Sequence, residues 1–171
     1  PNLPAVFNNF LMADNEPKES TSSYQKIMHR VKKHLNVTYK TDDATLKVSA
    51  SSFADYEKRK DYFVRMMKNK PYFMENLLLS IFTYRNFPFS GDSIGGIWEN
   101  YIYLCWIYSS LKFVLTVCSE DIHSHSELIA LCVPLLRRWA HSSEITKTFI
   151  NEFQKNSSNT LAHMAVLLKS C

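Results

Sequence analysis

The chain has 171 residues, of which 46% are hydrophobic, and its formal net charge at pH 7 is +4. A chain of this length can bury the core of one domain, and the composition excludes the intrinsically disordered class. The net charge is too small to indicate a nucleic-acid-binding protein by itself.

The three glycines, Gly91, Gly95 and Gly96, all lie within six residues. Sheet proteins need turn glycines spread along the chain, so this confinement indicates an all-α fold. We expect a single-domain multi-helix bundle over residues 1–171, with residues 1–22 as a loosely attached leading segment.

The first strong helix signal follows a short apolar helix at 3–12 and a polar loop at 13–22. Ser22 or Ser23 can cap a helix that runs to about Leu35, because each offers an oxygen to the free amides of the first turn. Apolar residues at helical spacing predict one inward stripe, made of Tyr24, Ile27, Met28, Val31 and Leu35.

The other side of this helix is basic, with Lys26, Arg30 and Lys33. Residues 1–70 carry 13 lysines and arginines against 8 acidic residues, while the rest of the chain carries 7 against 8. The basic side is either a solvated helix face or a docking surface for an acidic partner. We expect His29 and His34 to face solvent.

Residues 36–52 break the helical period and predict a loop that can hold a short hairpin. A helix over 53–69 follows, in which the charged segment 57–61 (E-K-R-K-D) is expected to face water. Its predicted inward residues are Phe53, Tyr56, Phe63, Val64 and Met67. Pro71 suits the first turn of the next helix, 71–85, because its missing N–H costs nothing there. That helix is expected to bury Phe73, Leu77, Leu78 and Ile81.

Residues 86–96 form the main break, and the helix at about 97–118 is the most apolar piece. The uncharged window between Glu99 and Lys112 is 12 residues long, whereas a membrane span needs about 20. The sequence therefore predicts a largely buried central helix and no membrane span. Helices at 126–141, 143–155 and 158–170 complete the chain, and Pro134 should kink the first of these or mark its first turn.

The four cysteines, Cys105, Cys118, Cys132 and Cys171, form no C-x-x-C pair, and the first three lie in apolar helical runs. This pattern indicates buried free thiols and a reducing compartment, so we expect a cytoplasmic protein. The first residues also lack the basic and apolar regions of a signal peptide.

No glycine-rich nucleotide or phosphate motif and no G-x-S-x-G elbow is present, so we expect no catalytic residue here. His123 and His125 with Asp121 could hold a metal ion, but no further ligands follow at suitable spacing. An exposed loop between helices explains them better, and we expect no metal site. Helix ends account for His141 and His163.

Two isolated charges lie among apolar residues, Glu75 and Lys112. A buried carboxylate must be paired or hydrogen-bonded, so Glu75 is a structural partner or a catalytic base. A Glu75–Lys112 or Glu99–Lys112 pair would satisfy both. The aromatic run Y-I-Y-L-C-W-I-Y indicates an aromatic-rich core, with a base-stacking surface as the alternative.

The order of motifs over residues 54–170 resembles the flagellin lysine-N-methylase family. An aromatic, basic helix ends in K-P-Y and leads to E-N-L-L-L-S-I-F, N-F-P-F, W-E-N-Y-I-Y-L, S-L-K-F-V-L and R-R-W-A-H-S. The residues that carry these motifs are expected to be structural: Glu75, Asn76, Phe87, Pro88, Phe89, Glu99, Asn100, Tyr101, Lys112 and His141.

The resemblance implies transfer of methyl groups from S-adenosylmethionine to lysine ε-amines of flagellin. It also implies an iron–sulfur cluster on an N-terminal cysteine-rich segment, which this sequence lacks. The chain would then be the C-terminal part of a longer protein and hold no cofactor itself. Its expected partners are flagellin and the missing N-terminal part, contacted through Lys26, Arg30 and Lys33.

Two other readings of the sequence stay open. One is a helical adaptor or regulatory domain unrelated to methylation. The other is a nucleic-acid-binding domain that uses helix 24–35, which salt-sensitive DNA binding would favour. Our preferred interpretation includes no nucleic-acid partner.

Overall fold

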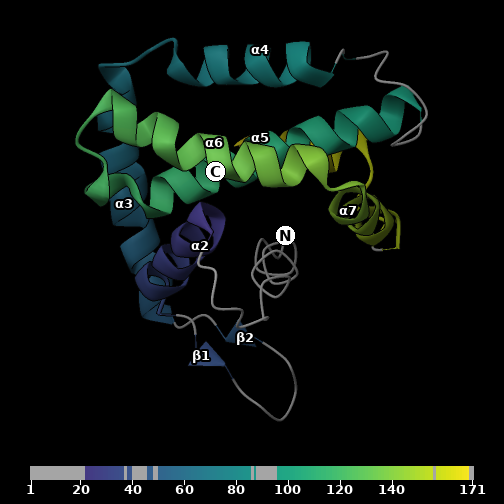
Figure 1. Ribbon diagram of the computed structural model, residues 1–171. Coiled ribbons are helices and arrows are strands. Elements are labelled where there is room, and N and C mark those ends of the chain that lie inside the picture. Colours follow the sequence, from purple (N-terminus) through teal and green to yellow (C-terminus); the bar gives the residue numbers. More distant parts are fainter. Residues whose placement is uncertain are drawn as a thin grey trace. The chain divides into compact units, whose positions relative to one another are not determined.

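The computed structural model describes residues 22–36, 38–39, 46–47, 50–85, 87, 96–155 and 157–169. Within these residues the chain is built from α-helices, which confirms the predicted all-α class (Figure 1). The helices are α2 (Ser23–His34), α3 (Ala50–Lys68), α4 (Phe73–Arg85), α5 (Ile97–Val117), α6 (His125–His141), α7 (Ser143–Lys155) and α8 (Leu161–Lys169), with a short 3₁₀ helix η1 (Ser119–Asp121).

The chain divides into two compact units. Unit 1 comprises Pro1–Phe63 and Val114–Pro134, and unit 2 comprises Val64–Phe113 and Leu135–Cys171. Helices α3, α5 and α6 each contribute residues to both units. The single domain over residues 1–171 stays a prediction, and the helix expected at 3–12 lies outside the described residues.

Helix α2 forms as its sequence predicts. The Ser22 hydroxyl accepts a hydrogen bond from the Gln25 amide at 3.3 Å, and the Gln25 side chain accepts one from the Ser22 amide at 3.0 Å. This capping box satisfies two amides that the helix leaves without partners. The helix ends at His34, and Asn36 follows at a positive φ of 46°, a conformation that asparagine tolerates.

The core of unit 1 includes the whole predicted stripe of α2, which is buried. The end of α5, η1 and the first part of α6 add further apolar side chains. Buried residues of this group are Val114, Leu115, Val117, Cys118, Ile122, Leu128, Leu131 and Cys132. Two short strands, β1 (Thr38–Tyr39) and β2 (Leu46–Lys47), pair antiparallel inside the segment predicted as a loop with a hairpin.

The core of unit 2 is organised around α5, which is buried along most of its length from Asn100 onward. The ring of Trp106 lies against Phe149 at a centroid distance of 4.0 Å and against Trp139 at 5.5 Å. The Tyr103 hydroxyl donates to the Trp139 carbonyl at 3.0 Å, and the Ser109 hydroxyl donates to the Leu167 carbonyl at 3.1 Å. The predicted buried central helix and its aromatic core are confirmed.

The boundaries and faces of α3 and α4 differ from the prediction in several places, and α3 begins at Ala50, earlier than predicted. Helix α4 begins at Phe73, so Pro71 lies in the turn before the helix and not in its first turn. Val64 was expected to face inward but is 49% exposed, because it lies about 100° around the helix from the buried Phe63. Leu77 and Ile81 of α4 are buried as predicted, whereas Phe73 and Leu78 are only half-buried.

Pro134 lies inside α6, which excludes the first-turn alternative. Because proline has no N–H, the helix loses the bond that would reach the Ala130 carbonyl. Helix α8 begins at Leu161, later than predicted. The Thr160 hydroxyl caps it by accepting from the His163 amide at 3.3 Å and contacts His163 Nδ1 at 2.7 Å. His163 thus has the helix-end role expected of it.

Candidate partner-binding surfaces

The basic face of α2, defined as Lys26, Arg30 and Lys33, is exposed in unit 1. Burial of the opposite apolar stripe holds these three side chains outward. Lys33 also lies in the last turn, where the helix dipole favours positive charge. The face therefore offers cations to a partner, although partner binding itself stays a prediction.

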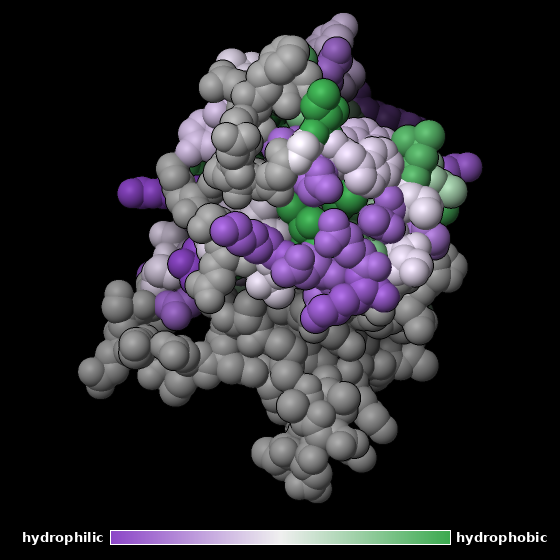
Figure 2. Space-filling view, turned by 90° about the vertical axis from the view of Figure 1, so that its right-hand side faces the viewer, coloured by the Kyte–Doolittle hydropathy of each residue, from purple (hydrophilic) through white to green (hydrophobic). Residues whose placement is uncertain are grey.

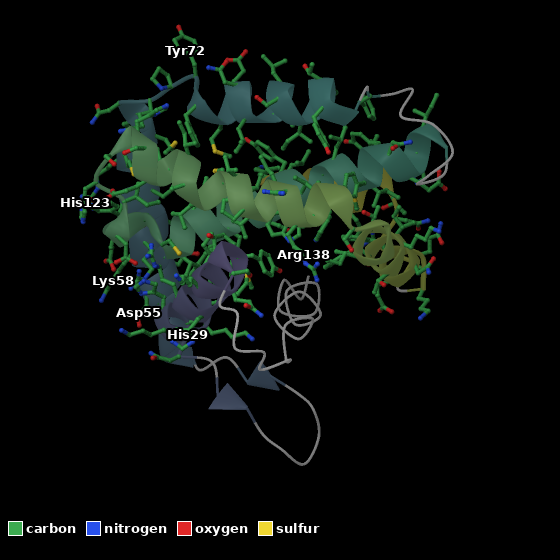
Figure 3. All side chains as sticks on the ribbon, in the orientation of Figure 1. His29, Asp55, Lys58, Tyr72, His123 and Arg138 are labelled. Carbon is green, nitrogen blue, oxygen red and sulfur yellow. The ribbon has the colours of Figure 1, made fainter. Side chains whose placement is uncertain are left out.

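Arg30 and His34 contact Asp121 at the end of η1. Arg30 Nε lies 3.8 Å from Asp121 Oδ2, and His34 Nε2 lies 2.7 Å from the same oxygen. The expectation that His34 faces solvent is wrong, since its side chain is only 19% exposed. Arg30 is thus partly engaged within unit 1, whereas His29 is exposed as expected (Figure 3).

Arg59 joins α3 to the end of α5 and to η1. Its Nη1 donates to the Val117 carbonyl at 2.8 Å, and its Nη2 lies 2.8 Å from Glu120. The Ser119 hydroxyl donates to the Arg59 carbonyl at 3.2 Å. The Arg59 side chain is 15% exposed, so the prediction that segment 57–61 faces water is wrong at this position.

The loop that holds His123 and Ser124 caps the start of α6. Glu127 Oε2 accepts from the amides of His123 at 2.6 Å and Ser124 at 3.0 Å. The bonds from these amides, His123 first, hold the pKa of Glu127 below its ordinary value. His123 points outward at the edge of unit 1 (Figure 3). In the part of the chain that the structure describes, no His, Cys, Asp or Glu side chains form a group that could hold a metal ion.

Cys105, Cys118 and Cys132 are buried free thiols, as predicted. Burial raises the pKa of Cys118 and of Cys132 to about 12, and it raises the pKa of Cys105. Metal clusters bind the thiolate form, which such burial disfavours. The three described cysteines are not part of any group of side chains that could hold a metal ion, and Cys171 lies outside the described residues.

The W-E-N-Y motif forms the first turn of α5. Asn100 is buried and its Nδ2 donates to the Gly96 carbonyl at 3.0 Å. A β-carbon on Gly96 would lie 3.2 Å from Glu99 Oε2, so the Glu99 carboxylate folds back over the start of the helix. Negative charge in this place is stabilised by the free amides and the helix dipole.

The two aromatic residues of the motif are stacked on each other. The rings of Trp98 and Tyr101 have centroids 5.4 Å apart at an interplanar angle of 28°. Trp98 Nε1 donates to the Asn159 carbonyl at 3.1 Å, which links α5 to the segment between α7 and α8. This arrangement holds Trp98 in one orientation at the surface of unit 2.

The other motif residues that the structure describes differ in how far they are buried. Glu75 and Asn76 are exposed on α4, so the Glu75 carboxylate needs no buried partner. Phe87 is half-buried with its ring edge-on to Phe82 at 4.9 Å. Lys112 is half-buried, and the Glu75–Lys112 and Glu99–Lys112 pairs stay predictions.

Three further motif positions fall partly or wholly outside the described residues. Pro88 and Phe89 are not among the described residues, and only the backbone of His141 is, as the last residue of α6. Tyr72 of the K-P-Y motif projects from the turn before α4 and is 69% exposed (Figure 3).

The family model of the FliB lysine N-methylase C-terminal domain matches residues 4–167. The chain belongs to this family. The match covers nearly all of the sequence and includes every motif that carried the resemblance. No curated protein and no solved structure gives a significant match.

Membership in the FliB family places the chain in the context of lysine methylation and flagellin. Within the described part of the chain, no helix combines the length and the hydropathy that a bilayer crossing requires.

Proposed function

We propose that this chain is the C-terminal region of an enzyme that methylates lysine ε-amines of flagellin with S-adenosylmethionine as methyl donor. Its own role is to bind flagellin or to support the catalytic part. The observation that carries this proposal is the family match over residues 4–167.

Charge supports a binding role. Lys26 and Lys33 are exposed on one side of α2, and no comparable basic surplus exists after residue 70. A clustered positive face speeds the association with an acidic surface. Flagellin, or the N-terminal part of the same protein, would supply that surface.

The cofactors belong to another part of the protein in this proposal. The described cysteines are buried free thiols, and among the described residues no His, Cys, Asp or Glu side chains form a group that could hold a metal ion, which supports this proposal. We therefore assign the iron–sulfur cluster and the methyl donor to the region that precedes this domain. Free buried thiols also suit action in the reducing cytoplasm.

The test is the rate at which the chain associates with purified flagellin at low and high salt, for the natural chain and for Lys26→Glu/Lys33→Glu. Arg30 is left intact because it contacts Asp121. We expect association of the double variant to be about tenfold slower at low salt, and the difference to shrink near 0.1 M salt, where screening acts beyond about 10 Å.

The matched control is Lys147→Glu/Lys169→Glu, which makes the same charge change on exposed residues of unit 2. Its association rate should stay within about twofold of the natural rate if the basic face of α2 makes the contact. If both double variants associate equally slowly, the net charge of the chain controls the rate, and the basic face of α2 is not the contact. No binding of flagellin by the natural chain would refute the binding role.

A further inference from the structure

Trp98 differs from the other two tryptophans of the chain in its exposure. It is 37% exposed, whereas Trp106 is 1% and Trp139 is 0% exposed. The bond to the Asn159 carbonyl satisfies its N–H, and the stack on Tyr101 fixes its ring. A partner that covers this ring meets a side chain that has already lost its freedom and leaves no donor unpaired, which favours binding.

The surroundings of Trp98 are apolar and exposed. Ile97, its neighbour in the chain, is 63% exposed. Leu161, two residues after the hydrogen-bonding Asn159, is 65% exposed. In Figure 1 the start of α5 lies on the same side of unit 2 as α7, and Figure 2 shows hydrophobic side chains exposed among hydrophilic ones on that side. The hydrogen bond between Trp98 and Asn159 brings the start of α5 next to the segment that leads into α8, and both carry exposed apolar side chains.

The two segments that the Trp98–Asn159 hydrogen bond brings together, 96–101 and 157–163, carry one acidic residue, Glu99, and no lysine or arginine. Glu99 is half-buried beside Trp98. His163 is engaged by Thr160. The ligand that suits an aromatic face next to a carboxylate is a cation on an apolar stem.

We propose that the Trp98 surface, defined as Ile97, Trp98, Glu99, Tyr101 and Leu161, docks a lysine side chain of flagellin. This inference rests on the proposed function and names the part of the substrate that unit 2 recognises. The lysine stem packs on the apolar residues, its ammonium lies over the indole, which is the best aromatic partner for a cation, and the Glu99 carboxylate adds attraction. The surface holds the substrate and takes no part in methyl transfer.

The test measures the affinity of the chain for flagellin by calorimetry, with natural flagellin and with flagellin whose lysines have been acetylated. Acetylation removes the positive charge and keeps the stem. We expect Trp98→Ala to weaken binding of natural flagellin about 5- to 30-fold, the factor that a cation–π contact of ordinary strength supplies. Acetylated flagellin should bind weakly and equally to both chains.

Tyr72→Ala is the matched control, because Tyr72 is an exposed aromatic residue of unit 2, and Figure 3 shows it at the opposite side of the view from the start of α5. Trp98→Phe keeps an aromatic ring but loses the bond to Asn159, and it should cost less than Trp98→Ala. Acrylamide quenching gives an independent readout, since Trp98 is the exposed tryptophan. Flagellin freed of its own tryptophans should protect Trp98 from quenching.

Each outcome decides the proposal. Flagellin binding that is equal for the natural chain and both Trp98 variants overturns it, even though the proposed function stands. Loss of binding that is the same for acetylated and natural flagellin overturns the lysine assignment. Self-association of the natural chain that Trp98→Ala abolishes, with flagellin affinity unchanged, means that a second copy covers the surface. No flagellin binding by the natural chain removes the proposed function and the inference together.

Discussion

Replacing Arg59 by alanine should destabilise unit 1. The change removes a charged donor from the Val117 carbonyl and a 2.8 Å ion pair with Glu120. Hydrogen bonds to charged groups contribute about 1.5–3 kcal/mol. The ion pair adds less than about 1 kcal/mol, because Glu120 is 51% exposed and such pairs are weak. We therefore expect a loss of about 2–3 kcal/mol in the free energy of unfolding.

The assay is urea unfolding followed by circular dichroism, with the midpoint and slope compared between variants. Arg59→Lys keeps the charge but lacks the planar fork that reaches two acceptors, so it should recover only part of the loss. Lys58→Ala is the control, since Lys58 is the exposed neighbour on the same helix (Figure 3). An Arg59→Ala variant within about 0.5 kcal/mol of the natural chain would refute this account of unit 1.

Two further predictions follow from pKa shifts. Cys118 and Cys132 have pKa values of about 12 and lie buried, so iodoacetamide at about pH 8 should leave them unmodified in the folded Cys171→Ser chain and label them in urea. Rapid labelling of the folded chain, read by mass spectrometry, would contradict their burial. The lowered pKa of Glu127 means that its cap stabilises fully above the ordinary value of 4.5 and is lost as pH falls through the folded-state pKa. Glu127→Gln should therefore be less stable than the natural chain at neutral pH, and the difference in unfolding midpoint should shrink in acid; a difference that grows on acidification would refute the cap.

Local sequence signals predicted most of the fold. Ser22 and the apolar stripe of α2 define that helix because capping and periodicity act within a few residues. The buried α5 could be predicted because a helix that is apolar on all sides must lie in a core. The burial of Cys105, Cys118 and Cys132 could be predicted in the same way, because these cysteines lie in apolar helical runs.

The sequence-based predictions of side-chain exposure were wrong at positions where contacts between distant residues determine burial. Arg59 lies three residues after Tyr56 and four before Phe63, so its spacing placed it on the inward face, but its charge favoured solvent. The contact of His34 with Asp121 joins residues 87 positions apart, which no local pattern can indicate. Glu75 lies among apolar neighbours in the sequence, which raised the question of a buried partner, but α4 exposes this residue to solvent.

The Trp98 surface could be predicted only in part from the sequence. The sequence marked W-E-N-Y as a family motif, but the aromatic run that follows it favoured burial for the whole segment. Exposure of Trp98 and its bond to Asn159 depend on where α8 begins. The sequence could thus identify the motif but not the side of it that faces a partner.

The central claim is that the protein containing this domain methylates flagellin lysines. The most direct measurement is mass spectrometry of flagellin purified from cells that carry the gene, cells that lack it and cells to which it has been returned. We predict that methyl-lysine disappears when the gene is removed and reappears when it is restored. Unchanged methylation of flagellin in cells that lack the gene would contradict the claim.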